Sequence, residues 1–112
     1  MQVRAQGKHL RMSPRKARLM MQDLRGMRVE DALTTLRFTP KPGAKDIAKV
    51  VQSAAANAEN NFSLEGDRLR ISAIYAGDAR TLKRYKAAAR GRARPILRRT
   101  CHVTVVVSDD KE

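Results

Sequence analysis

The chain has 112 residues, which is enough for one domain with a modest hydrophobic core. Its 24 lysines and arginines against 11 aspartates and glutamates give a formal net charge of +13 and a pI of about 11.1. So large a positive excess favours a nucleic acid as partner. The absence of tryptophan argues against a basic protein of the membrane surface.

An edge strand and a helix are predicted at the start of the chain. Residues 2–11 alternate loosely between apolar and polar side chains, which is typical of a short strand with one buried face. A helix should begin after Ser13, whose hydroxyl can cap exposed N–H groups, with Pro14 in its first turn. We expect this helix to run to about Arg25 and to close at Gly26. Its inward residues follow helical spacing: Ala17, Met20, Met21 and Leu24.

Two further helices are predicted. The second covers residues 29–37, with Glu30 and Asp31 in the first turn, where negative charge stabilises a helix. The third covers residues 44–61, and its inner face is expected to carry Ile47, Val50, Val51, Ala54, Ala58 and either Asn61 or Phe62. The small side chains at 53–56 suit close packing or contact with an RNA backbone, and packing is the preferred interpretation.

Two strands are predicted in the second half of the chain. Residues 68–76 should place on one face Leu69, Ile71, Ala73 and Tyr75. Residues 101–108 should do the same with Cys101, Val103, Val105 and Val107. The two strands are antiparallel if the segment between them is a hairpin. The predicted fold is therefore α+β: a three-stranded antiparallel sheet packed against three helices, with a long protruding β-hairpin.

The segment between these strands, residues 80–99, holds nine basic side chains and no acidic one. Structureless connections of about twenty residues are uncommon in compact domains, so we interpret the segment as a β-hairpin with its turn near Gly91. The single domain is thus divided into a globular body, residues 1–79 and 100–112, and an extended basic hairpin, residues 80–99. Tyr85 suits either stacking on a base or pairing across the hairpin, and both interpretations stay open.

These cations predict an RNA-binding surface. Arginine outnumbers lysine in the hairpin, which suits bidentate contacts to phosphates. Repulsion among so many like charges also calls for a polyanion as counter-charge. With three basic residues of the first helix, the predicted RNA-binding residues are Arg15, Lys16, Arg18, Arg80, Lys83, Arg84, Lys86, Arg90, Arg92, Arg94, Arg98 and Arg99.

No catalytic or metal site is predicted. His9, His102 and the single Cys101 do not have the spacing of a four-ligand zinc site, and Cys101 is expected to be a small buried apolar residue. The sequence contains no P-loop, no dinucleotide-binding glycine motif and no Gly-x-Ser-x-Gly. We therefore expect no enzymatic activity and no cofactor. The single cysteine, with no long apolar run and no secretory signal, predicts a cytoplasmic protein.

Four motifs carry a resemblance to a known family: SAAANAENN at 53–61, LKR at 82–84, RGRA at 90–93 and RRTCHVTVVV at 98–107. In this order they resemble the bacterial large-subunit ribosomal protein L22 family, across essentially the whole chain. The resemblance implies a structural constituent of the large ribosomal subunit that binds 23S rRNA and supports assembly.

The resemblance also implies where the parts of the chain lie. The body would sit near the exit of the nascent-peptide tunnel, and the hairpin tip would line the tunnel beside the macrolide site. The tip residues would be Ala87, Ala88, Ala89, Arg90, Gly91, Arg92 and Ala93. The implied partners are 23S rRNA, neighbouring large-subunit ribosomal proteins and the nascent peptide, with no membrane contact and no homo-oligomer.

Two other functions of basic domains fit this sequence less well. A DNA-architectural protein also uses β-arms, but those arms insert apolar wedges between bases, and here the tip region is alanine and arginine. An enzyme that modifies rRNA would need a cofactor pocket or a catalytic group, and the sequence carries a motif for neither.

Overall fold

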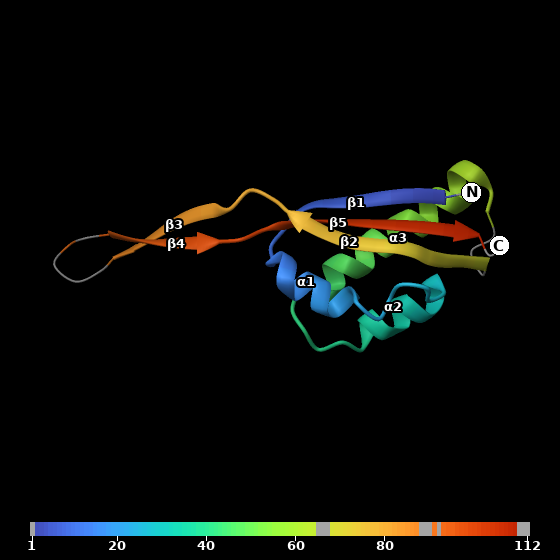
Figure 1. The fold of residues 1–112 in the computed structure, drawn as a ribbon, viewed down its shortest axis with the longest axis horizontal. Helices are drawn as coiled ribbons and strands as arrows, with labels where there is room; N and C mark the ends of the chain where they lie inside the picture. Colours follow the sequence, from blue (N-terminus) through green and yellow to red (C-terminus); the bar gives the residue numbers. More distant parts are fainter. Residues whose placement is uncertain (1, 65–67, 88–90, 92, 110–112) are drawn as a thin grey trace.

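The computed structural model describes residues 2–64, 68–87, 91 and 93–109 (Figure 1). The elements in chain order are β1 (Gln2–Leu10), α1 (Pro14–Met21), α2 (Val29–Arg37), α3 (Ala44–Phe62), β2 (Leu69–Asp78), β3 (Leu82–Ala87), β4 (Ala93–Arg98) and β5 (Cys101–Asp109). The predicted α+β class is confirmed, with its helices on one face of a three-stranded antiparallel sheet (Figure 1).

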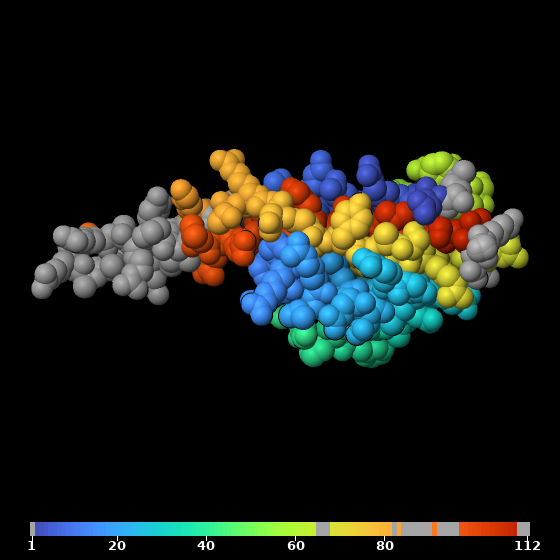
Figure 2. Space-filling view, in the orientation of Figure 1, coloured from blue at the N-terminus to red at the C-terminus, as the bar shows by residue number. Residues whose placement is uncertain are grey.

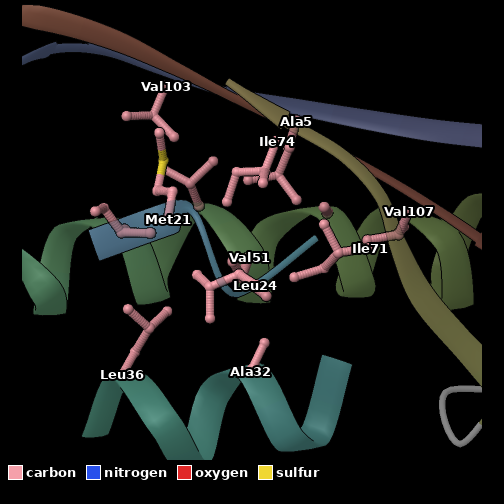
Figure 3. Packing of buried hydrophobic residues seen from close by; sticks show 14 of the residues in the cluster. Ala5, Met21, Leu24, Ala32, Leu36, Val51, Ile71, Ile74, Val103 and Val107 are labelled. Atoms are coloured by element: carbon pink, nitrogen blue, oxygen red, sulfur yellow. The ribbon is translucent and has the colours of Figure 1, made fainter. Parts of the chain in front are cut away.

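The sheet has the order β1-β5-β2, so the last strand lies in its centre. Strand β5 follows the predicted alternation, with Val103, Val105 and Val107 fully buried against the helices. Strand β1 is an edge strand as predicted, and Val3 and Ala5 are its buried residues. In the core, these strands meet side chains of all three helices and of the turn after α1 (Figure 3).

A β-bulge in β2 reverses the face predicted for half of this strand. Between Ile71 and Ala73 the register against β5 shifts by one residue. Because strand side chains alternate between faces, an extra residue moves all later side chains to the opposite face. Ile74 and Ala76 are therefore buried, and the prediction for Ala73 and Tyr75 is wrong. Tyr75 is 49 % exposed.

Helix α1 ends at Met21 rather than near Arg25. The chain then continues in turns, in which the Leu24 N–H donates to the Met21 carbonyl at 3.0 Å. The Gly26 N–H donates to the Ile71 carbonyl of β2 at 2.8 Å, so pairing with the sheet replaces the helical hydrogen bond there. Gly26 has a φ of 85°, which suits glycine, but the C-cap of α1 is Gln22, so the prediction that Gly26 closes this helix is wrong.

Helix α2 has the predicted bounds, and α3 extends one residue further than predicted, to Phe62. The inner face predicted for α3 is confirmed as far as Ala58, but Asn61 and Phe62 are exposed. After α3 the chain turns at Ser63, which has a φ of 55°, and Leu64 packs against the core in their place. Burial varies along the run of small residues at 53–56. Ala54 is buried, as packing requires, while Ser53 and Ala56 are exposed.

Strands β3 and β4 form a separate two-stranded sheet, which we call the arm. Their antiparallel register runs from Leu82 opposite Arg98 to Ala87 opposite Ala93. The arm extends away from the body (Figure 1), and the molecule measures 63 × 25 × 19 Å. Gly91 has a φ of 73°, in keeping with its predicted place in the turn. Most of the predicted tip, residues 88–90 and 92, lies outside the described residues.

Candidate nucleic-acid interface

The two longest stretches of the chain without an acidic residue are residues 1–22 and residues 79–108. The fold brings them together at the base of the arm, where Leu10 at the end of β1 pairs with Cys101 at the start of β5. The start of α1 lies beside the end of the arm on the face shown in Figure 2. Positive charge from both segments therefore gathers at this junction.

A groove of about 700 Å³ lies at this junction, and we call it the neck groove. Its basic lining residues, all exposed, are Arg11, Arg15, Lys16, Arg98 and Arg99. Four of these were predicted to bind RNA, and they come from opposite ends of the chain. Arg11 was missed, although its place in the acid-free first segment is a signal for it. No described residue that lines the groove is acidic, so it is suited to an anion.

The neck groove is held by hydrogen bonds on both sides. The Thr100 hydroxyl donates to the Arg80 carbonyl at 2.6 Å, and the Ala79 N–H donates to the Thr100 carbonyl at 3.2 Å. These bonds fix the two chain segments that enter the arm. On the other side, the Lys16 N–H donates to the Ser13 hydroxyl at 3.4 Å, which confirms the predicted cap of α1. The positive end of the α1 dipole thus lies at the groove.

Arg18, also predicted to bind RNA, lies at a different place. Its Nε and Nη2 atoms donate to the Ala76 carbonyl of β2 at 3.3 and 2.8 Å, and Nη2 of Arg25 donates to the Ile74 carbonyl at 3.3 Å. These bonds cover the outer edge of β2, whose free carbonyls would otherwise offer pairing to another strand. Both acceptors are neutral, so the bonds leave each guanidinium its positive charge.

The two arginines border a hollow of about 360 Å³ between α1 and β2, which we call the edge hollow. Tyr75 lines the hollow with Arg18 and Arg25. Tyr75 was not predicted to belong to a site, because the alternation of apolar residues in the sequence assigns it to the core face. Only the bulge in β2 reverses that assignment, and ordinary strand residues on either side of it give no signal of a bulge.

The remaining predicted RNA-binding residues belong to the segment 80–99, which contains the arm. Arg80 and Lys83 are exposed. The backbones of Arg84, Lys86 and Arg94 lie in β3 and β4, while Arg90 and Arg92 lie outside the described residues. Lys86 is the register partner of Arg94.

The structure brings His9 and His102 together although they are far apart in sequence. Their ring centroids are 4.7 Å apart in an edge-to-face arrangement, and the His9 N–H donates to Nδ1 of His102 at 3.1 Å. Nδ1 of His102 therefore acts as an acceptor. Among the described residues there is no cluster of three or more side chains that could hold a metal ion. The pair is part of the junction between β1 and β5.

Cys101 is fully buried, as predicted. Burial raises the pKa of its thiol, and the nearby Arg18 opposes this only in part. A thiol with a raised pKa stays protonated and is a poor nucleophile, which agrees with a packing role. Within the described ranges, no helix is long and apolar enough to cross a membrane.

The sequence of the chain is similar to those of known proteins. Residues 5–108 match the family described as Ribosomal protein L22p/L17e. The chain is 49 % identical over 109 residues to the large ribosomal subunit protein uL22 of Clostridium novyi, covering 97 % of this chain and 98 % of that protein. It is 51 % identical to uL22 of Dehalococcoides mccartyi, with 97 % and 100 % covered, and 48 % identical to uL22 of Pelotomaculum thermopropionicum, with 100 % and 99 % covered.

Proposed function

The chain belongs to the Ribosomal protein L22p/L17e family, and from that membership we propose that it is a structural constituent of the large ribosomal subunit that binds 23S rRNA. The family is one of structural ribosomal components, so the chain is not an enzyme. Its place of action is the ribosome in the cytoplasm. Its partners are rRNA and neighbouring ribosomal proteins.

The neck groove is the observation that supports rRNA binding. It joins exposed cations of the body, such as Arg15 and Lys16, to cations at the base of the arm, Arg98 and Arg99. An RNA strand in the groove would contact both parts at once, and its phosphates would neutralise charge that the described lining leaves without an acidic neighbour. RNA binding would thereby fix the direction of the arm relative to the body.

The arm supports the finer part of the proposal. A ribbon of two strands is narrow enough to lie between crowded RNA segments, where it neutralises phosphates and supports assembly. Its tip, residues 87–93, lines the nascent-peptide tunnel in this proposal, which rests on the family resemblance and on the length of the molecule, 63 Å. The nascent peptide is then a further partner.

The salt dependence of RNA binding tests the electrostatic mechanism. If about five to eight phosphates are neutralised, log affinity for an rRNA fragment should fall against log salt with a slope of about −4 to −6. The double variant Arg98→Ala/Arg99→Ala should reduce the magnitude of this slope by about 1.5, because each lost phosphate contact contributes about 0.7 to 0.9. The measurement is filter binding or fluorescence anisotropy over a series of salt concentrations.

A matched control removes the same charge elsewhere. Arg37→Ala/Lys49→Ala changes two exposed cations on α2 and α3 outside the neck groove, and it should leave the slope near the parental value. A slope near zero for the parent would contradict the electrostatic mechanism. Equal losses in both double variants would show that net charge, and not the neck groove, governs binding.

A further inference from the structure

The edge hollow combines an aromatic side chain with two fixed cations. Tyr75 is turned out of the core by the β-bulge and remains 49 % exposed, whereas the apolar residues on either side of it, Ile74 and Ala76, are buried. Bulges re-aim side chains and occur often next to functional sites. A half-exposed tyrosine at the border of a hollow presents a surface on which a planar group can stack.

Arg18 and Arg25 are held in place before any ligand arrives. Two nitrogen atoms of Arg18 and one of Arg25 donate to carbonyls of β2, which fixes the side chains on the protein. A guanidinium has five N–H donors, so each keeps donors for a second acceptor. Arginine in this state binds a phosphate with little loss of side-chain entropy. No described residue that lines the edge hollow is acidic.

We propose that the edge hollow is a second RNA-binding site, which takes one unpaired nucleotide: Tyr75 stacks on the base, and Arg18 and Arg25 contact the adjoining phosphates. This inference rests on the proposed function. Stacking on an aromatic side chain combined with basic contacts to the backbone is the usual way in which proteins hold single-stranded RNA. A base paired within a duplex is already stacked on both sides, so the ligand is an unpaired nucleotide.

The position of the edge hollow connects it to the neck groove. Arg15 and Lys16 at the start of α1 line the neck groove, and Arg18 and Arg25, further along the same segment, line the edge hollow. The outer surface of α1 lies beside β2 on one face of the body (Figure 2). One RNA strand can therefore pass from the base of the arm along α1 to Tyr75.

Intrinsic fluorescence provides a direct test, because the chain has two tyrosines and no tryptophan. In a Tyr85→Phe variant, Tyr75 is the only tyrosine that emits. The variant is titrated with a single-stranded oligoribonucleotide of about 12 nucleotides, within the usual range of site sizes for single-strand binding. Stacking should quench the Tyr75 emission in a saturable way. Absence of quenching while anisotropy shows that the RNA is bound would overturn the proposal.

Affinity measurements add a second readout. Tyr75→Leu should weaken binding of the same oligonucleotide by roughly 5- to 100-fold, the usual effect of losing one stacked base, and Tyr75→Phe should restore it. Phe38→Leu changes an exposed aromatic residue outside the hollow and should have no effect. Stacking involves no charge, so Tyr75→Leu should leave the slope of log affinity against log salt unchanged. Arg18→Gln should reduce the magnitude of this slope, because a phosphate contact is lost.

The outcomes separate this inference from the proposed function. If Tyr75→Leu binds RNA with the parental affinity while Arg98→Ala/Arg99→Ala still binds more weakly, the second site is overturned and the proposed function stands. Failure of the parent protein to bind RNA would overturn both. If Tyr75→Leu does not fold, the quenching measurement still decides, because the Tyr85→Phe variant keeps Tyr75.

Discussion

Gly7 lies where β1 approaches α3 closely. A Cβ atom added at this position would be 2.5 Å from Cγ2 of Val50, a distance that carbon atoms do not tolerate without movement. The need for glycine is thus steric, since the residue belongs to a strand and the neighbour is a core side chain of α3. The close contact holds the edge strand against the helix.

Gly7→Ala should destabilise the protein by about 1 to 3 kcal/mol, the usual range for overpacking a core. The measurement is the free energy of unfolding from a urea titration. Gly77→Ala is the matched control, because a Cβ added to Gly77 meets no atom within 4 Å, and its effect should be small. The second substitution Val50→Ala should relieve part of the Gly7→Ala defect. Equal effects of the two glycine substitutions would contradict the steric explanation.

At the scale of elements, the strands differ in how far their sequence predicts them. In strand β5 the buried valines were predicted correctly, although Thr104 on the opposite face is buried as well. Strand β2 alternates as well, but its bulge depends on how it pairs with β5, and no local residue marks it. Likewise α1 ends early because Gly26 pairs with Ile71, a partner distant in sequence that overrides local helix propensity.

The same distinction holds for the candidate site. Charge is a property of single residues, so Arg15, Lys16, Arg98 and Arg99 were predicted from composition. Their meeting in one groove follows from the pairing of β1 with β5. The edge hollow was not predicted, because the outward direction of Tyr75 depends on the bulge in β2.

The division between body and arm makes a prediction at this scale. Every buried apolar residue of the described core lies outside residues 80–99. Replacing this segment by an Asn-Gly turn should therefore leave a folded body while weakening its retention on the ribosome. Circular dichroism and thermal unfolding measure whether the body is folded, and sedimentation with large subunits measures its retention on the ribosome. Loss of the body's folded signal would mean that the arm belongs to the core.

At the scale of the whole molecule, the hydrophobic core of the body and the basic arm lie in different parts of the fold. The core lies between the helices and the three-stranded sheet (Figure 3), and the arm extends the molecule to 63 Å. Cations are dense in the acid-free segments that form the arm and its base. The molecule is thus built to hold a basic ribbon at a distance from a stable anchor.

The geometry of the ribbon makes a last prediction. Strand β3 pairs residue by residue with β4, from Leu82 opposite Arg98 to Ala87 opposite Ala93. Removing residues 82–84 shortens this side of the arm by about 10 Å, at roughly 3.3 Å per residue. Because three is an odd number, the deletion also moves the residues that follow to the opposite face. The arm must then bend or pair anew, which displaces the tip.

If the tip lines the tunnel, as proposed, the deletion should change inhibition of translation by erythromycin without preventing assembly, because the neck groove stays intact. The measurement is translation by ribosomes that carry the variant, at increasing erythromycin. Removing only residues 82 and 83 is the control: the shortening is about 7 Å, but the residues that follow keep their faces, so the effect should be smaller. Normal incorporation of the three-residue deletion with unchanged inhibition would show that the tip does not shape the tunnel where the drug binds.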